Sequence, residues 1–154
     1  MEILIYHPVQ IGDVVIGSHC ARLLKKKHPE STITFVTSEF LVPLIEPCPW
    51  IDFCVPAPEF QSHELVNPRD SHKYRGLPPW EINDIAHIKT FEKLREDWKP
   101  DKAYRPHWSP SPPHPVSYRS PYMFRCYASC CELTEEESND TAYRLPIDLS
   151  LIHI

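Results

Sequence analysis

The chain has 154 residues, of which 42% are hydrophobic, so it can bury the core of one domain of ordinary size. Its formal net charge of −5 and its isoelectric point near 6.0 argue against general nucleic-acid binding, which requires a basic surface. No apolar run approaches the roughly 18 residues of a membrane span, and the N-terminus lacks the basic start and the cleavage site of a signal peptide.

The first part of the chain alternates between strand and helix patterns. Short β-branched and apolar runs predict strands at residues 3–6, 32–37 and 51–55. A turn at residues 8–12 leads into a helix over 13–27, whose apolar stripe is Ile16, Cys20, Leu23 and Leu24. Ser38 is expected to cap a short second helix. This order predicts an α/β fold, a Rossmann-like doubly wound parallel sheet.

The remaining elements are separated by two long loops, expected at residues 57–83 and 106–120. Between the loops we expect a helix over 84–98 and a fourth strand over 102–105. The inward residues of that helix are predicted to be Ile85, Ile88, Phe91, Leu94 and Trp98. Another helix should begin at Ser120 and Pro121, with an apolar stripe of Tyr122, Cys126, Cys130 and Leu133. Thr134 to Glu137 has the pattern of a capping box, and residues 142–147 suit a last strand or the approach to a linker.

The last six residues, 149–154, match a translation of CTG TCT CTT ATA CAC ATC, a transposon adapter used in preparing sequencing libraries. A genuine last strand is the alternative. If the adapter origin holds, residues 1–148 are the natural part, and the segment that follows them in the intact protein is missing here. Such a scar is excluded from reasoning about the fold.

The six cysteines show no C-x-x-C pair. Free thiols, mostly buried, in a reduced cytosol are therefore expected. The alternative, a metal site built from Cys126, Cys130 and Cys131, lacks the partner pair that zinc requires. We expect no metal ion and no resident cofactor.

The loop after the first strand is the first candidate site, because ligands of open parallel sheets bind beyond the carboxyl ends of the strands. This loop has one glycine, Gly12, and so is not the glycine-rich fingerprint of a dinucleotide site. Gly12 is expected to let the backbone turn tightly and to leave open space beside Asp13. Asp13 follows it at the opening of a helix, where the helix dipole stabilises an ionised carboxylate. Asp13 could act as a general base or could simply cap the helix.

The order of these segments resembles that of family 9 glycosyltransferases, whose best-known members are ADP-heptose–lipopolysaccharide heptosyltransferases. Residues 2–58 carry most of the resemblance: the first strand, Ile11-Gly12-Asp13, the lysine run before Pro29, and the strand Ile33-Thr34-Phe35-Val36. Residues 101–106 and 143–146 show a weaker resemblance to the same family. His19 departs from the pattern, because many relatives have proline there, and the loop after the fourth strand is unusually rich in proline.

The resemblance implies that residues 1–148 are the acceptor-side domain of a GT-B enzyme, with the nucleotide-sugar domain missing. It implies that Asp13 is the general base of an inverting transfer of a heptosyl or related group. The donor would be a sugar nucleotide such as ADP-heptose, and the acceptor a lipopolysaccharide core or lipid A-linked sugar. The truncated chain alone is expected to be inactive. The location would be cytoplasmic, with peripheral contact to the inner membrane left open.

The acceptor is expected to contact the loops beyond the strands. Arg69, Lys73 and Arg75 could bind its anionic groups, and an exposed tryptophan can stack on a sugar face. A solvated loop and ordinary core packing are the respective alternatives. The full set of candidate acceptor-binding residues is Gln10, Ile11, Gly12, Arg69, Lys73, Arg75, His107 and Trp108.

Two other classes of protein compete with a glycosyltransferase. A complete single-domain α/β binding module would need no catalytic group, although a receiver domain would require an acidic pair and a phosphorylatable aspartate at other positions. A nucleotide-sugar epimerase or dehydrogenase is disfavoured, because the glycine fingerprint is absent.

Overall fold

The computed structural model describes residues 1–8, 10–57, 79–106 and 120–140. Four parallel strands form one sheet in the order β3-β2-β1-β4, namely β1 (Glu2–Tyr6), β2 (Thr32–Thr37), β3 (Phe53–Pro56) and β4 (Lys102–Tyr104). This is the strand order of the first part of a Rossmann fold. The predicted Rossmann-like parallel sheet is confirmed, and the third and fourth strands differ from the predicted bounds by one or two residues.

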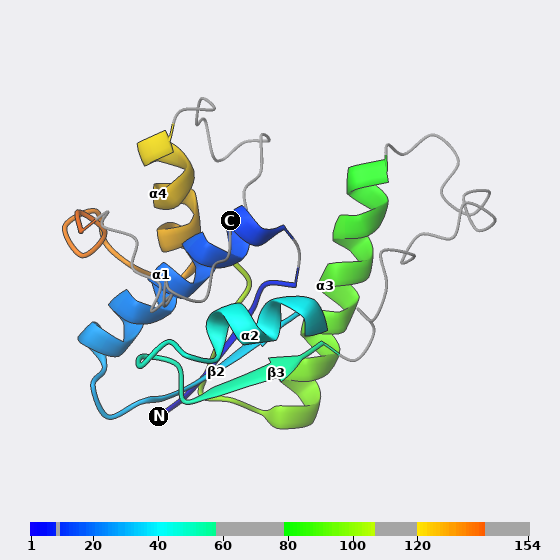
Figure 1. Ribbon diagram of the computed structural model, residues 1–154, viewed down its shortest axis with the longest axis horizontal. Helices are drawn as coiled ribbons and strands as arrows, with labels where there is room; N and C mark the ends of the chain where they lie inside the picture. Colours follow the sequence, from blue (N-terminus) through cyan, green and yellow to red (C-terminus); the bar gives the residue numbers. More distant parts are fainter. Residues whose placement is uncertain (9, 58–78, 107–119, 141–154) are drawn as a thin grey trace, which may run out of the picture.

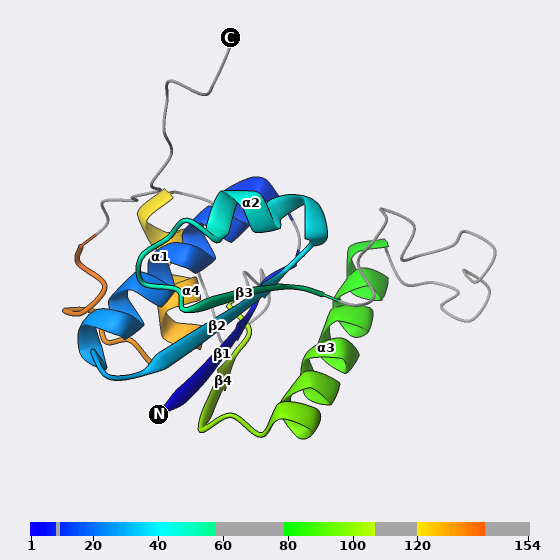
Figure 2. The ribbon, with the colours of Figure 1, turned by 60° about the horizontal axis from the view of Figure 1, so that its bottom comes forward.

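Helices cover both faces of the sheet (Figures 1 and 2). One face packs against α1 (Ile11–Lys27), the 3-10 turn η1 (Glu39–Leu41), α2 (Val42–Ile45) and α4 (Ser120–Cys130), and the other packs against α3 (Pro79–Trp98). Side chains of β1 alternate between the two cores: Ile3 and Ile5 join the first, whereas Leu4 and Tyr6 join the second. The sheet is therefore doubly wound, as predicted.

Helix α1 packs against both the sheet and α4. Cys20, Leu23 and Leu24 of the predicted stripe lie in the core, and Ile16 packs against its rim. A side chain at Gly17 would place its Cβ 3.3 Å from Cζ of Phe35, which is tighter than ordinary contact. Gly17 thus lets α1 lie close to β2. On the side toward α4, the ring of His19 packs against the ring of Phe124, with the ring centroids 4.9 Å apart.

Helix α3 begins at Pro79, so residues 79–83, which were predicted to belong to a loop, are helical. Residues 58–78 of that predicted loop lie outside the described residues. Its buried face differs from the prediction. Phe91 and Leu94 are buried, but Ile88 and Trp98 are 39% and 43% exposed. His87 and Thr90 lie inward instead. The reason lies on the sheet, where the Tyr6 hydroxyl is 3.3 Å from Nδ1 of His87 and gives that polar side chain a buried partner. Ile85 belongs to the side chains that are not described.

Helix α4 begins at Ser120 as predicted, but it buries more side chains than the predicted stripe. Phe124, Tyr127 and Ala128 are at most 2% exposed, whereas Cys130 is only half-buried. Cys126 is buried, as predicted, and Leu133 is buried beyond the end of the helix. The side chain of Tyr122 is not described. The predicted stripe was too narrow, because α4 packs against both α1 and the sheet and its inward face is wider than one line of residues.

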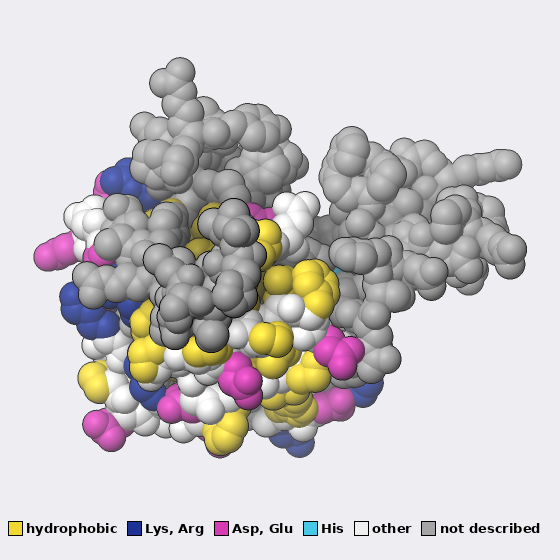
Figure 3. Space-filling model, viewed as in Figure 1, with side chains coloured by type: hydrophobic (Ala, Val, Ile, Leu, Met, Phe, Trp, Pro, Cys, Tyr) yellow, Lys and Arg dark blue, Asp and Glu magenta, His cyan; other side chains and the backbone are white. Residues whose placement is uncertain are grey.

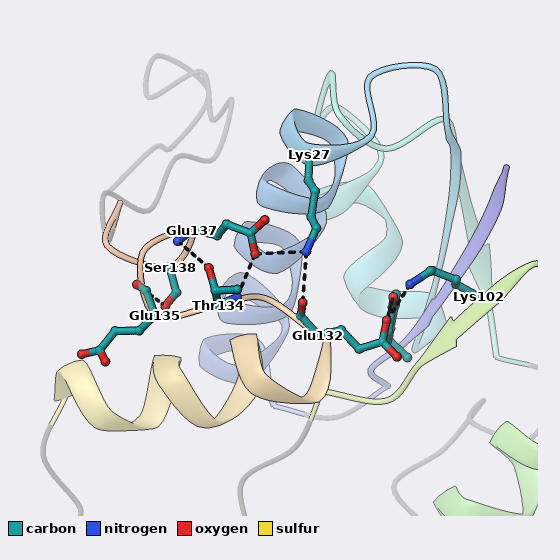
Figure 4. A network of polar contacts seen from close by, with 8 residues as sticks. Lys27, Lys102, Glu132, Thr134, Glu135, Glu137 and Ser138 are labelled. Atoms are coloured by element: carbon teal, nitrogen blue, oxygen red, sulfur yellow. Dashed lines mark hydrogen bonds and ion pairs between the residues drawn. The ribbon is translucent and has the colours of Figure 1, made fainter.

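A polar network closes the edge of the sheet where the strands begin (Figure 4). Thr134 and Glu137 bond reciprocally, with the Glu137 amide donating to Thr134 Oγ1 and the Thr134 amide donating to Glu137 Oε2. The predicted capping box is confirmed. Lys27, at the end of α1, pairs with Glu137 at 3.1 Å, and Lys102 pairs with Glu132 at 2.6 Å. This network joins α1 and β4 to the turn that follows α4.

Candidate functional site

The candidate site lies at the opposite edge, where the strands end. The tight turn that leads from β1 into α1 occurs at Gln10, the N-cap residue, with φ 58° and ψ 121°. The helix begins at Ile11, two residues earlier than predicted, and Gly12 is inside its first turn. The Ser38 hydroxyl donates to the carbonyl of Pro8 and does not cap η1 through its side chain. This bond holds the loop after β1 against the end of β2.

Asp13 occupies the first turn of α1 as a helical residue. The alternative that Asp13 is the N-cap is therefore wrong, because Gln10 holds that position. Asp13 is half-buried, and this burial raises the pKa of its carboxyl group, although a hydrogen bond from Tyr127 acts in the opposite direction. A raised pKa makes the ionised carboxylate a stronger base.

The sequence did not single out two aromatic residues that pack together near the start of α1. Tyr127 of α4 is 2% exposed, and its hydroxyl group acts to lower the pKa of Asp13. His7, directly after β1, meets the Tyr127 ring edge-on, with ring centroids 5.4 Å apart and planes at 75°. The position of His7 at the end of a strand could have indicated it. No local pattern indicated Tyr127, because its approach to Asp13 depends on how α4 packs on α1.

Of the predicted acceptor-binding residues, three flank Asp13 at the start of α1. Gln10 is exposed, and Ile11 is 62% exposed. A Cβ added at Gly12 would meet nothing within 4 Å, so the predicted open space beside Asp13 is confirmed. The predicted role of Gly12 in the tight turn is wrong, since the positive φ belongs to Gln10. The other predicted positions, Arg69, Lys73, Arg75, His107 and Trp108, lie outside the described residues.

A depression of about 350 Å³ is lined by Arg95, Asp101, Lys102, Tyr104 and Glu132, among others. It lies at the edge where the strands begin, since Asp101 accepts a hydrogen bond from the amide of Glu2 at the start of β1. Its charged groups already have partners: Lys102 pairs with Glu132, as Figure 4 shows, and Arg95 pairs with Glu92. This depression is therefore part of the structural network and is separate from Asp13.

Within the described ranges, no group of three or more His, Cys, Asp or Glu side chains could hold a metal ion. The cysteines are free thiols, as expected, and Cys20, Cys48, Cys126 and Cys131 are buried. Burial raises the pKa of Cys48 to about 11 and that of Cys54 to about 12, so these thiols stay neutral at physiological pH. Cys48 and Cys54 thus contribute packing rather than a nucleophile.

The described surface is of mixed charge. Figure 3 shows acidic and basic side chains interspersed with hydrophobic ones over the described part of one face. No helix in the described part of the chain combines the length and the apolar character that crossing a bilayer requires.

Two solved structures resemble the chain. The first, E. coli ADP-heptose LPS heptosyltransferase II, is 22% identical, and the match covers 68% of this chain and 24% of that one, with a TM-score of 0.41. The second, a family 9 glycosyltransferase from Veillonella parvula DSM 2008, is 16% identical, and the match covers 95% of this chain and 44% of that one, with a TM-score of 0.56.

No protein-family model matches the chain, and no curated protein sequence does. The chain spans less than half of the length of either solved protein. The similarity to the Veillonella structure extends over nearly the whole of this chain and concerns its backbone path. The chain therefore has the fold of part of a family 9 glycosyltransferase, and the resemblance predicted from its sequence is confirmed at the level of the fold.

Proposed function

We propose that the chain forms the acceptor-side domain of a glycosyltransferase in which Asp13 is the general base. The observation that carries the proposal is the environment of Asp13. Its carboxylate is half-buried in the first turn of α1, beyond the end of β1, and borders the open space at Gly12. The fold shared with a family 9 glycosyltransferase supports the same class of activity.

The proposed chemistry is a direct displacement with inversion. The Asp13 carboxylate accepts the proton of an acceptor hydroxyl, and the acceptor oxygen forms a bond with the anomeric carbon of the donor sugar. The bond from that carbon to the nucleoside diphosphate breaks, and the diphosphate leaves with the electron pair. The positive charge at the anomeric centre should make the transition state resemble an oxocarbenium ion, as in glycoside hydrolysis.

The proposed substrates are a nucleotide sugar, such as ADP-heptose, and a sugar of the lipopolysaccharide core or linked to lipid A. Because the chain spans less than half of each solved relative, the donor would be bound mainly by a further domain of the whole protein. The chain alone is then inactive. We propose a cytoplasmic location, with peripheral contact to the inner membrane where the acceptor lies.

The test uses the full-length protein that carries this chain and compares it with Asp13→Asn. Asparagine keeps the shape and can still accept the Tyr127 hydrogen bond, but it cannot take a proton. Loss of a general base typically lowers the rate about 10²–10⁴-fold. We expect kcat, measured as release of ADP from ADP-heptose in the presence of a core acceptor, to fall by that factor, with little change in the KM of the acceptor.

Glu39→Gln is the matched control, because Glu39 is also an acidic residue in a first helical turn beyond the end of a strand, but it is exposed. This variant should keep normal kcat. Wild-type kcat in Asp13→Asn would show that the proposed base is wrong. Equal losses in both variants would point to a general effect of negative charge at this edge.

A further inference from the structure

His19 lies where α1 meets α4 and the turn that follows it. Helices α1 and α4 lie side by side on one face of the sheet (Figures 1 and 2). The side chain of His19 is 1% exposed, and its ring packs against that of Phe124. Nε2 of the ring is 2.6 Å from the backbone carbonyl oxygen of Asp140, which is 121 residues further along the chain. His19 is therefore a buried titratable group that joins two distant parts of the fold.

Two polar contacts of the His19 ring determine its protonation state. The carbonyl oxygen of Asp140 can only accept a hydrogen bond, so Nε2 must carry a hydrogen. On the other side of the ring, Nε of Arg22 lies 3.4 Å from Nδ1, and a guanidinium group can only donate. Nδ1 must then accept this long hydrogen bond and carry no hydrogen. Both contacts therefore require the neutral imidazole with its hydrogen on Nε2.

Protonation of His19 would place a hydrogen on Nδ1, directly opposite the N–H group of Arg22. Two donors and two positive charges would then face each other across 3.4 Å in a place from which water is largely excluded. The Asp140 carboxylate, which pairs with Arg22 at 2.6 Å, offsets part of this repulsion. The protonated ring is thus poorly accommodated as long as the contacts with Arg22 and Asp140 persist.

The surroundings of His19 oppose its positive charge overall. Burial and the charge of Arg22 outweigh the bond to the Asp140 carbonyl and the charge of Asp140, so the pKa of His19 is lowered from its usual value. Within the described residues, the charged groups that act on His19 are Arg22 of the same helix and Asp140 after α4. Helix α4 itself presents the uncharged ring of Phe124.

A proton that binds more tightly to the open arrangement than to the closed one drives opening. A histidine released from these contacts should titrate near the ordinary value of about 6.5, and the bonded ring titrates lower. The closed arrangement is therefore fully stable above about pH 6.5, and it loses stability as the pH falls from there toward the pKa of the bonded ring. For one proton, the equilibrium shifts by at most about 10-fold per pH unit.

We propose that His19 is a proton-operated latch: when its ring takes up a proton in mildly acidic solution, α1 releases the chain at Asp140. The Arg22–Asp140 ion pair does not respond in this range, because carboxyl groups ordinarily stay ionised down to about pH 4. The inference goes beyond the proposed function and does not depend on the role of Asp13.

The test is an NMR titration of this chain between about pH 7.5 and about pH 5, a range that brackets the ordinary pKa of histidine. The ¹⁵N signals of the His19 ring report its tautomer and its protonation, and the ¹³C signal of the Asp140 carbonyl reports the hydrogen bond. We expect the Nε2–H tautomer at the upper end, and a joint change of both signals with one midpoint below about 6.5. The heteronuclear NOE of the Asp140 amide should fall over the same range, because a released segment moves within nanoseconds.

His19→Gln supplies a form that cannot titrate, because the amide hydrogen of glutamine can replace the Nε2 hydrogen toward the Asp140 carbonyl. In this variant the Asp140 signals should stay constant over the same pH range. His28→Gln is the matched control, since His28 is the C-cap histidine of the same helix and its hydrogen bonds run through its backbone. It should keep the wild-type response of Asp140.

The wild-type titration decides the question even if His19→Gln does not fold. The latch is overturned if His19 gains a proton while the Asp140 carbonyl signal or its heteronuclear NOE stays constant. A ring that stays neutral down to about pH 5, or a midpoint above about 6.5, would overturn it as well. Where His19→Gln folds, an equal response of Asp140 in that variant would assign the release to another group.

Discussion

Arg22 of α1 and Asp140 form an ion pair of 2.6 Å that fastens the last described residue of the chain to the first helix. The side chains are 17% and 36% exposed, so the pair is partly shielded from water. His19, one helical turn before Arg22, places its Nε2 2.6 Å from the backbone carbonyl of Asp140. The sequence analysis singled out His19 as a departure from the pattern that the chain resembles, and in the structure its ring packs against Phe124.

The Arg22–Asp140 pair should stabilise the fold measurably. We expect a double-mutant cycle with Arg22→Ala and Asp140→Ala to give a coupling free energy of about 1 kcal/mol in urea unfolding, since partial burial weakens the screening by solvent. The exposed pair Lys93–Asp97 is the control, because its 2.7 Å distance is similar but its side chains are 68% and 52% exposed. Its coupling should stay below about 0.5 kcal/mol. Equal couplings would mean that burial does not decide the strength of these pairs.

Asp13→Asn should not destabilise the chain at neutral pH. Because burial raises the pKa of Asp13, the ionised carboxylate is less favourable in the folded state than in the unfolded state. The protonated carboxyl group stabilises the fold fully below the pKa that Asp13 has in the unfolded chain. This stabilisation is lost as the pH rises through the pKa that Asp13 has in the folded chain. Asparagine avoids this loss, so the Tm at pH 7 should equal or exceed that of the wild type, and the difference should shrink near pH 3. A lower Tm at pH 7 would contradict this account.

Two isomeric side chains, a leucine and an isoleucine, can test which side of α3 is buried. Leu94 is 6% exposed and belongs to the second core, whereas Ile88 is 39% exposed. Leu94→Ala should cost about 2–3 kcal/mol in free energy of unfolding, and Ile88→Ala less than about 1 kcal/mol. The sequence pattern placed both residues inward and would predict similar losses. Similar measured losses would therefore favour that pattern over the observed face.

Because of Asp52, the free energy of unfolding should decrease in acid. Burial acts to raise the pKa of this carboxyl, but the amide of Ile33, which donates at 2.7 Å, and Lys25 at 2.9 Å outweigh it and lower the pKa. The stabilisation is complete above the unfolded pKa of about 3.9 and is lost as pH falls through the folded pKa. Asp52→Asn should therefore be less stable than the wild type at pH 6 and approach it at pH 2. A difference that is the same at both pH values would exclude Asp52 as a source of acid sensitivity.

The sequence predicted the positions of the helices and strands better than it predicted which side of each helix is buried. β1 contains a short apolar run and β2 is rich in β-branched and aromatic residues, so both strands were located closely from composition alone. The inward side of α3 could not be predicted, because it depends on the Tyr6 hydroxyl that accommodates His87 across the core. At the site, Asp13 follows from its place after a strand, whereas Tyr127 depends on tertiary packing. Its partnership with Asp13 has no local signature.

The two outer strands of the described sheet are short and poorly suited to recruit another strand. β4 has three residues and begins with Lys102, whose charge is paired with Glu132. β3 has four residues and ends at Pro56, which lacks an amide hydrogen. Brevity, charge and proline are devices that limit edge-to-edge association of sheets. Expression of this chain at high concentration should therefore be limited less by amyloid-like strand addition at these edges than by exposed apolar side chains such as Ile11, Phe40 and Phe53.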